Sequence, residues 1–409
     1  MLMLDEANRC LQCKNARCKT HCPISTPIPE VIALYKDGKL KEAGEMLFNN
    51  NPLSLVCSIV CPHEDQCRGF CIKGIKGEPV RFHEIETEIS SQYLDELNFE
   101  SSIKNKDKIA IVGGGPAGIT IAFILAQRGY EVTIFDMHEK IGGVLRYGIP
   151  EYRLPNSMID KIEDKLLQLD IKIRPNTIIG PVVTIDDLFN DGYKSIFIGT
   201  GVWNPKKLNI KGETLGNVHY AIDYLKSPSV YNLGERVAVI GAGNVAMDAA
   251  RVAKRSGAKE VYVLYRKGED DMPATKDEIR EAKEDDVMFE YFVAPLEITE
   301  DGVKLVATEN VVGDDGRVST KILDGQEEFF NCDSVIIAVS QAPKTNIVAN
   351  TTKLEVNKWG LIVTDEFGQT TREGVFSSGD VVTGAKTVVH AVANAKIVAD
   401  AMDEYCRNN

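Results

Sequence analysis

Residues 109–118 read IAIVGGGPAG, a glycine-rich turn that follows directly on an apolar run. A second apolar run at 131–135 completes the pattern of a strand, a turn, a helix and a strand. In this pattern Gly113 permits the tight turn, Gly115 lets the backbone approach a pyrophosphate, and Gly118 lets the helix pack closely on the strand. The helix N-terminus attracts phosphate charge. The stretch predicts a Rossmann-like dinucleotide-binding domain.

Asp136 follows the second run, about 20 residues after the turn, where a carboxylate accepts hydrogen bonds from an adenosine ribose. An acidic residue there favours the unphosphorylated ribose of FAD or NAD. Three later segments match a flavoprotein pattern, favour FAD and are expected to converge on the turn: 141–150, 197–201 and 374–380. The cofactor-binding residues predicted for this domain are Gly113, Gly115, Pro116, Ala117, Gly118, Asp136, Gly143, Leu145, Arg146, Thr200, Gly201, Gly379, Asp380 and Thr387.

Residues 237–246, VAVIGAGNVA, repeat the motif as GxGxxA and predict a second dinucleotide site, for the nicotinamide cofactor. Two cations, Arg266 and Lys267, stand where the first unit has its acidic residue. Cations pair with a 2′-phosphate, so they favour NADPH over NADH. The alternative is that Arg266 and Lys267 lie in a solvent-exposed loop and bind no ligand. The residues predicted to bind this cofactor are Gly241, Gly243, Asn244, Val245, Ala246, Arg266 and Lys267.

The second unit is predicted to be an insertion in the first. Alternating runs at 287–298, 302–309 and 321–330 predict antiparallel strands, with turns at Asp301-Gly302 and Asp315-Gly316. The chain is then expected to return to the first domain. The predicted α/β architecture is a small helical domain at 1–105, an FAD-binding Rossmann-like domain at 106–230 and 334–409, and a nicotinamide-binding Rossmann-like domain at 231–333.

Eight of the ten cysteines lie before residue 72, in two quartets that each contain a Cys-Pro step. The quartets are Cys10, Cys13, Cys18 and Cys22, then Cys57, Cys61, Cys67 and Cys71. In a cytosolic chain this density indicates metal or cluster ligation rather than disulfides. Iron-sulfur clusters are favoured over zinc because a flavin reduced by a hydride needs one-electron acceptors. Cys332 and Cys406 are interpreted as unpaired structural thiols.

These motifs together resemble the small subunit of NADPH-dependent glutamate synthase, the N-terminal half of dihydropyrimidine dehydrogenase and its separate bacterial subunit. The resemblance rests on both cysteine quartets, both glycine-rich turns, and the segments 142–150, 152–155 and 379–383. It implies an α-helical N-terminal domain with two 4Fe-4S clusters whose ligands interleave between the quartets. The implied ligands are Cys10, Cys13, Cys18 and Cys71 for the first cluster site, and Cys22, Cys61, Cys67 and Glu86 for the second cluster site.

Spacing and resemblance disagree about Cys57. By spacing it belongs to the second quartet, whereas the resemblance makes it a non-ligand and assigns the fourth position to a Glu or Gln downstream of the last cysteine. Glu86 falls at that position, and Glu84 and Glu88 are its neighbouring rivals. A carboxylate ligand is expected to alter the reduction potential of its cluster.

Composition sets limits on the class of protein. With 409 residues, 44% hydrophobic and 26% charged, the chain is expected to form two or three globular domains. Its net charge of −13 argues against a general attraction to nucleic acid or to an anionic membrane surface. The N-terminus has no signal-peptide pattern and no apolar run reaches the roughly 20 residues of a membrane span, so a cytoplasmic location is expected.

The combined prediction is an electron-input flavoprotein. A hydride would pass from the C4 atom of NAD(P)H to the N5 atom of FAD, with no catalytic acid, base or nucleophile from the protein. Single electrons would then cross two 4Fe-4S clusters to a partner subunit that carries the substrate site, of the glutamate synthase or dihydropyrimidine dehydrogenase type. One alternative is a subunit of an electron-bifurcating NAD(P)H:ferredoxin transhydrogenase, for which ferredoxin is a further partner. Another is a non-catalytic scaffold that holds zinc.

Overall fold

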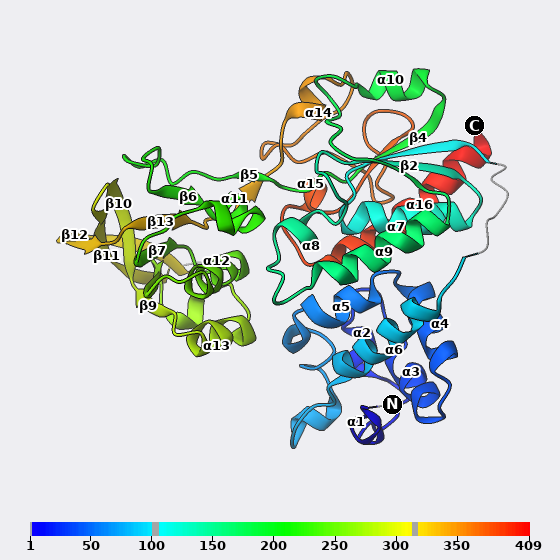
Figure 1. The fold of residues 1–409 in the computed structure, drawn as a ribbon, viewed down its shortest axis with the longest axis horizontal. Helices are drawn as coiled ribbons and strands as arrows, with labels where there is room; N and C mark the ends of the chain where they lie inside the picture. Colours follow the sequence, from blue (N-terminus) through cyan, green and yellow to red (C-terminus); the bar gives the residue numbers. More distant parts are fainter. Residues whose placement is uncertain (1, 100–105, 313–317) are drawn as a thin grey trace. The chain divides into compact units, whose positions relative to one another are not determined.

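The computed structural model describes residues 2–99, 106–312 and 318–409 (Figure 1). The chain divides into two compact units, and each is described by itself. The first unit consists of Met1–Arg146, Glu151–Val202 and Ala342–Asn409, and the second of Tyr147–Pro150 and Trp203–Gln341.

The first unit begins with a helical region that carries eight cysteines. Its helices are α1 (Leu4–Asn8), α2 (Arg17–Thr20), α3 (Ile28–Lys36), α4 (Leu40–Asn50), α5 (Ser54–Val60) and α6 (Phe82–Glu96), with the short 3-10 turns η1 (His63–Asp65) and η2 (Ile72–Ile75). The amphipathic faces of α3, α4 and α6 meet in a core that includes Ile32, Tyr35, Leu47 and Ile85. This core holds the cysteine-bearing loops in place.

A five-stranded parallel sheet forms the rest of the first unit, in the order β15-β4-β1-β2-β3. Its strands are β1 (Lys108–Val112), β2 (Glu131–Phe135), β3 (Lys172–Arg174), β4 (Tyr193–Ile198) and β15 (Val375–Ser377). Its helices are α7 (Pro116–Gln127), α8 (Val144–Tyr147), α9 (Asn156–Gln168), α10 (Ile185–Asn190), α14 (Asn346–Ala349), α15 (Asp380–Thr383) and α16 (Val388–Asn408). Nine of the twelve residues of α7 are buried, because this helix packs on the sheet and against α16 (Figure 1).

The second unit contains another five-stranded parallel sheet, in the order β6-β13-β7-β8-β9. Its strands are β6 (Val218–Tyr220), β7 (Arg236–Ile240), β8 (Glu260–Tyr265), β9 (Met288–Tyr291) and β13 (Ser334–Ile337). The longer helices are α11 (Ala221–Lys226), α12 (Asn244–Arg255) and α13 (Lys276–Glu284), and the 3-10 turns are η3 (Pro228–Val230) and η4 (Glu269–Asp271). The strand β2 has the bounds expected from its apolar run, and β1 and β7 lead directly into the glycine-rich turns as expected.

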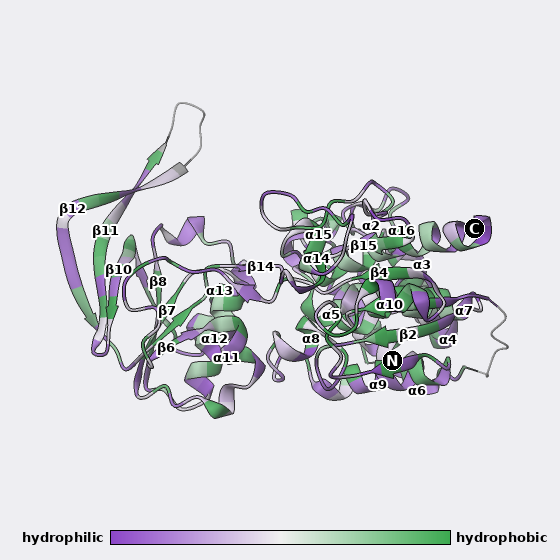
Figure 2. Cartoon of the chain, turned by 90° about the horizontal axis from the view of Figure 1, so that it is seen from above, coloured by the Kyte–Doolittle hydropathy of each residue, from purple (hydrophilic) through white to green (hydrophobic). Residues whose placement is uncertain are grey.

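An antiparallel sheet of β10 (Val293–Thr299), β11 (Gly302–Val312) and β12 (Val318–Asn331) completes the second unit. Figure 2 shows both hydrophobic and hydrophilic stretches along β11 and β12. Val303 and Leu305 of β11 are buried, whereas Phe329 of β12 is half exposed. The short strands β5 (Asn204–Pro205) and β14 (Gln341–Ala342) pair with each other.

The structure corrects the predicted domain boundaries. The strand Ser334–Ile337, expected to return the chain to the first domain, lies between β6 and β7 in the second unit. The chain passes from the first unit into the second after Val202 and returns after Gln341, whereas the predicted boundaries lay after residues 230 and 333. A short, fully buried apolar strand fits the centre of either parallel sheet, so its sequence does not say which sheet it joins.

The run at 287–298 is also not one antiparallel strand. Its first part, β9, pairs in parallel with β8, and its second part, β10, pairs antiparallel with β11. Phe292 separates the two parts with a φ of +58°, a left-handed conformation that ends one strand and redirects the next. The turn expected at Asp315-Gly316 lies outside the described residues.

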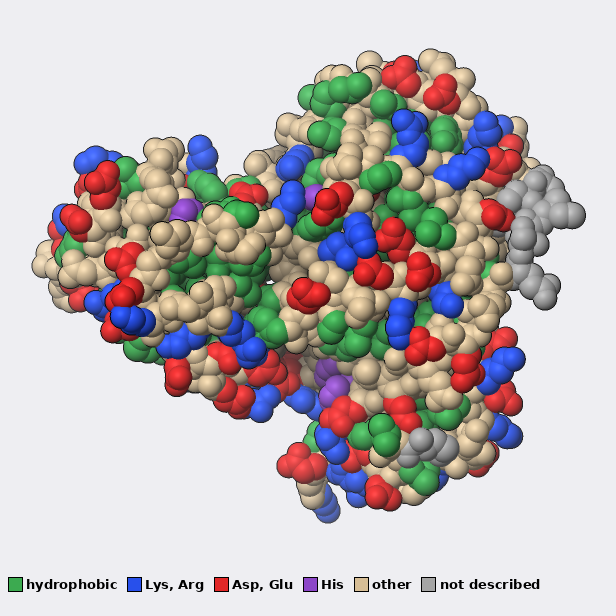
Figure 3. Space-filling model, in the orientation of Figure 1, with side chains coloured by type: hydrophobic (Ala, Val, Ile, Leu, Met, Phe, Trp, Pro, Cys, Tyr) green, Lys and Arg blue, Asp and Glu red, His purple; other side chains and the backbone are tan. Residues whose placement is uncertain are grey.

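Surface charge and helix length are the two structural features that relate to the limits set by composition. Acidic and basic side chains are interspersed over the face in Figure 3. Within the ranges that the structure describes, no helix has both the length and the apolar character needed to cross a membrane.

Candidate cofactor sites

The first glycine-rich turn has no room for side chains on its outer glycines. Gly113 has a φ of +105°, and a Cβ atom on it would lie 2.6 Å from the carbonyl oxygen of Gly199. A Cβ on Gly118 would lie 2.0 Å from the Gly113 carbonyl oxygen. Gly115 is different, because its nearest neighbour would be the Cα of Gly143, at 3.9 Å. The middle glycine therefore borders open space at the N-terminus of α7, where a phosphate group can approach.

The segments expected to converge on this turn do so. The Gly142 N–H donates to the Gly114 carbonyl at 2.7 Å, and the Gly199 N–H donates to the Val112 carbonyl at 2.8 Å. A Cβ on Gly379 would lie 3.5 Å from that of Ala117. Segments of the chain more than 200 residues apart thus form one site around the first turn of α7.

Asp136 is almost completely buried beside the turn. Its Oδ2 accepts the Gly114 N–H at 2.7 Å, and its Oδ1 accepts the His138 N–H at 2.8 Å. The His138 ring also lies 3.1 Å from Oδ1. Sequence analysis missed His138, whose only signal was its position two residues after the acid. These bonds fix the carboxylate at the turn, and its bond to a ribose remains a prediction.

Asp380 begins α15, and burial raises the pKa of its carboxyl group to about 6. The Lys386 N–H donates to its Oδ1 at 3.1 Å, which opposes this shift. Thr387 is the residue before α16, and its Oγ1 lies 2.6 Å from Nδ1 of His390. A partly buried carboxyl group with few donors is suited to accept hydrogen bonds from ligand hydroxyls.

The other residues predicted to contact FAD differ in what they offer. Pro116 starts α7, Leu145 is fully buried, and Thr200 and Gly201 are half buried after β4. The Arg146 guanidinium is used within the protein, because Nε donates to the Ile141 carbonyl at 2.9 Å and Nη2 donates to Asp160 at 2.7 Å. Arg146 therefore fixes the segment after β2, and a cofactor contact from it stays a prediction.

The second glycine-rich turn repeats the geometry of the first. Gly241 has a φ of +127°, and a Cβ atom on it would lie 2.4 Å from the Ala338 carbonyl oxygen. Gly243 precedes α12, and a Cβ atom on it would have no neighbour closer than 4.0 Å. Val245 is half buried and Ala246 fully buried in α12, while the Asn244 side chain accepts the Thr275 N–H at 3.0 Å. As in the first turn, the middle glycine of the motif is the residue that borders open space.

Arg266 and Lys267 follow β8 at the same carboxyl edge of the sheet. The turn and this edge are adjacent, because the Gly241 N–H donates to the carbonyl of Leu264 at 3.2 Å. Arg266 is exposed, and its guanidinium has no ion-pair partner among the described residues. Its backbone carbonyl accepts the Thr308 hydroxyl at 2.8 Å, which fixes the start of the loop. The cation is free to pair with an anion near the turn.

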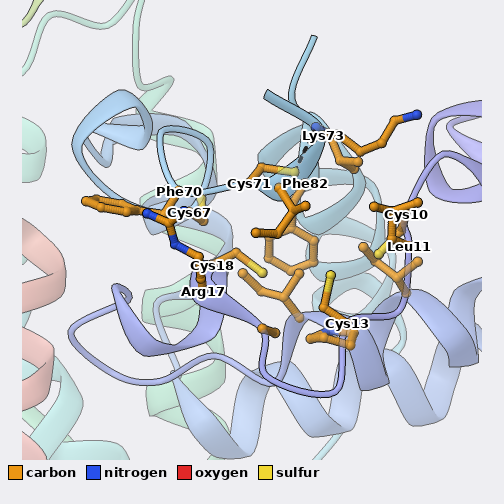
Figure 4. A pocket seen from close by; sticks show the side chains of 16 residues that line it. Cys10, Leu11, Cys13, Arg17, Cys18, Cys67, Phe70, Cys71, Lys73 and Phe82 are labelled. Atoms are coloured by element: carbon orange, nitrogen blue, oxygen red, sulfur yellow. Dashed lines mark hydrogen bonds between the residues drawn. The ribbon is translucent and has the colours of Figure 1, made fainter. Parts of the chain in front are cut away.

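The first cluster site surrounds one cavity. Figure 4 shows Cys10, Cys13, Cys18 and Cys71 lining it together with Phe82, and Cys67, assigned to the second cluster site, also borders it. The Val80 N–H donates to the Cys71 sulfur at 3.4 Å. Apolar residues, with Arg17 and Lys73, complete the wall, and all five cysteines are partly exposed. Thiolates around an apolar cavity, with a backbone donor to sulfur, suit a 4Fe-4S cluster.

The second cluster site gathers around Glu86 on α6. This carboxyl group is 7% exposed and has no hydrogen-bond or ion-pair partner within the described part of the chain. Burial raises its pKa well above the ordinary value, and the nearby Cys57 raises it further. Burial and the Glu86 charge also raise the pKa of Cys67, and a hydrogen bond with Cys57, together with burial, raises that of Cys61. A buried, unpartnered carboxylate among thiols fits an iron ligand, because iron supplies the missing positive charge.

The rivals of Glu86 have other partners. Glu84 accepts two hydrogen bonds from Arg81, at 2.8 and 2.9 Å. Glu88 accepts the Tyr35 hydroxyl at 2.5 Å and the N–H of Met3 at 3.1 Å. Neither group is left unpartnered, so the structure singles out the carboxylate between them.

The remaining thiols show no pairing. All ten cysteines are free, and Cys22 lies 3.2 Å from the Thr26 hydroxyl. Cys332 and Cys406 are buried, as expected for structural thiols. Among the described residues, no three His, Cys, Asp or Glu groups lie close enough together to hold a single metal ion.

Comparison with known proteins assigns the chain to a family. The model of the pyridine nucleotide-disulphide oxidoreductase family matches residues 107–395. The model described as dihydropyrimidine dehydrogenase domain II, 4Fe-4S cluster, matches residues 2–97. The small chain of NADPH glutamate synthase from Escherichia coli (strain K12) is 32% identical over 97% of this chain and 89% of its own length.

Two further proteins are similar to this chain over different shares of their lengths. Subunit beta of the NADP(+)-dependent formate dehydrogenase from Moorella thermoacetica is 33% identical over 96% of this chain, which covers 60% of that relative. The structure of FprA from Mycobacterium tuberculosis in complex with NADPH has a TM-score of 0.64 at 19% identity, over 74% of this chain and 85% of that one. The latter supports the fold of the two Rossmann-like domains.

The chain belongs to the pyridine nucleotide-disulphide oxidoreductase family, whose model matches the residues that form the two Rossmann-like domains. It is an NAD(P)H-dependent FAD oxidoreductase that carries a 4Fe-4S domain, and over nearly its whole length it is homologous to glutamate synthase small chains. The 4Fe-4S family match confirms the preference for iron-sulfur clusters over zinc.

Proposed function

We propose that this chain accepts electrons from NADPH and delivers them through two 4Fe-4S clusters to a partner subunit of the glutamate synthase type. The observation that carries the proposal is the homology to glutamate synthase small chains, since the E. coli small chain is 32% identical over 97% of this chain.

Different residues would bind the phosphate groups of the two dinucleotides. Gly115 and Gly243 leave the N-termini of α7 and α12 open for two pyrophosphates. Arg266 supplies the charge that pairs with a 2′-phosphate, which is the basis for NADPH over NADH. When bound, FAD supplies a carrier that accepts electrons in pairs and releases them singly. The protein contributes binding, orientation and charge.

The ligand sets belong to the same proposal. Cys10, Cys13, Cys18 and Cys71 would hold the first cluster, and Cys22, Cys61, Cys67 and Glu86 the second. The unpartnered burial of Glu86 supports its choice over Cys57. Cys57 is buried in the apolar helix α5, where it hydrogen-bonds with Cys61 and Asn51, and these contacts fit a packing role beside the second cluster site.

The test is an anaerobic titration of the purified protein with NADPH and, separately, NADH. Flavin absorption reports electron arrival at FAD, and electron paramagnetic resonance (EPR) reports arrival at the clusters. Bleaching of the flavin at a much lower NADPH concentration and signals from two clusters are expected. If neither nucleotide bleaches a flavin that dithionite reduces, the electron-input role is refuted.

The partner requires a second measurement. Isolation of the tagged chain from its native cells should recover a large subunit, and the complex should show NADPH-dependent glutamate synthase activity. Turnover that requires added ferredoxin would instead favour the bifurcating transhydrogenase. A complex that is active without ferredoxin would exclude it.

A further inference from the structure

Lys396 joins the sheet-bearing part of the first unit to its cysteine-bearing part. Its ammonium group on α16 donates to the backbone carbonyl of Asn50 at 2.8 Å and to Asn50 Oδ1 at 3.1 Å. Asn50 is the last residue of α4. Both acceptors are neutral oxygens, so these bonds leave the positive charge of Lys396 uncompensated.

The charged surroundings of Lys396 include a predicted cluster ligand. Cys22 and Asp400 are the charged groups that act on it, both in the direction that raises its pKa. Burial is the larger influence and lowers that pKa, because the group is partly removed from water. Asp400 is also engaged by Arg128, at 2.5 Å. The positive charge therefore lies within electrostatic reach of the second cluster site.

The same helix reaches from the predicted flavin site to this lysine. Thr387 precedes α16, and Lys396 is nine residues further on, or about 13 Å along the helix axis at about 1.5 Å per residue. On the cysteine-bearing side, α5 packs against α16 and leads directly into Cys61. Helix α16 thus connects the two sites between which electrons must pass.

We propose that Lys396 is a positioning residue that holds the second cluster site against α16 and raises the reduction potential of its cluster. The inference rests on the proposed function, because it takes Cys22 as a cluster ligand. Reduction adds a negative charge to the cluster, and a nearby cation stabilises the more negative state. The charge therefore favours electron transfer into the cluster.

The test compares holoproteins that carry K396Q, K396R or K161Q. Lys161 is a matched control, since its ammonium group on α9 pairs with Asp95 on α6 at 2.6 Å and so joins the same two parts of the first unit. Both groups of that pair are exposed. Iron and acid-labile sulfide contents are measured first, and EPR-monitored redox titrations then give a midpoint potential for each cluster.

In K396Q we expect the potential of the second cluster to become more negative while that of the first changes little. K396R should restore the wild-type value, and K161Q should leave both potentials unchanged. Equal potentials in K396Q and wild type, at full iron content, would overturn the inference, as would an equal shift in K161Q. If K396Q loses iron, retention of both clusters at wild-type potentials in K396R would support the role of the charge, and their loss in K396R would refute it.

The wild-type protein separates this inference from the proposed function. Failure of NADPH to reduce the wild-type flavin refutes the proposed function. Normal reduction of the wild-type flavin and clusters, with no change of potential in K396Q, refutes only the role of Lys396.

Discussion

Replacing glycines of the first turn should separate folding from cofactor binding. In G118A the new Cβ would lie 2.0 Å from the Gly113 carbonyl oxygen, where ordinary contact begins at about 3.4 Å. The backbone must therefore move by more than 1 Å, and overpacking of this kind costs about 1–3 kcal/mol. In G115A the new Cβ would lie 3.9 Å from the nearest protein atom, the Cα of Gly143, so the protein without cofactor should tolerate the methyl group.

The assay is thermal unfolding of both variants and the wild type, with and without added FAD, followed by circular dichroism and by flavin fluorescence. For G118A we expect a lower Tm even without FAD, by roughly 2–4 °C for each kcal/mol lost. For G115A we expect a wild-type Tm without FAD and little gain when FAD is added. The methyl group would occupy the space through which the pyrophosphate approaches. A wild-type Tm in G118A, or equal losses without FAD in both variants, would refute this reasoning.

Three further predictions address the other sites. C57A should keep the full iron content and both cluster signals, whereas E86A should alter or lose the signal of the second cluster only; loss of about half the iron from C57A would reverse the assignment. R266Q should weaken NADPH binding about 10- to 100-fold, the equivalent of roughly 1.5–3 kcal/mol for a hydrogen bond to a charged group, and should change NADH binding little. Equal losses for both nucleotides in the flavin-bleaching titration would contradict that role. Because the pKa of Asp380 in the folded protein is about 6 and its ordinary value is 3.8, the folded state binds the proton more tightly, and the stability of the FAD-free protein should fall as the pH rises from about 4 to about 6. Urea titrations should find this dependence reduced in D380N, and an equal slope in that variant would argue against it.

Sequence alone determined the elements whose pattern is local. The strands β1, β2 and β7 lie where their apolar runs predict them, because each is a short apolar run closed by a glycine or charged residue. The glycine-rich turns could also be predicted from sequence, since Gly113 and Gly241 need a positive φ that few other residues adopt. The density and spacing of the cysteines predicted the chemistry of the N-terminal domain, which the 4Fe-4S family match confirms.

Only the tertiary structure decided which elements become neighbours. The strand Ser334–Ile337 joins the second sheet because its hydrogen-bond partners there are β6 and β7, and no local pattern encodes that choice. Glu86 differs from Glu84 and Glu88 only in the helical face it occupies, so its burial depends on the packing of α6. Lys396 lies more than 300 residues from Asn50, and their contact exists only because α16 packs beside the cysteine-bearing helices. Local sequence fixes turns and strands through backbone sterics and hydrophobic period, whereas burial and partnership of charged groups depend on contacts between distant segments.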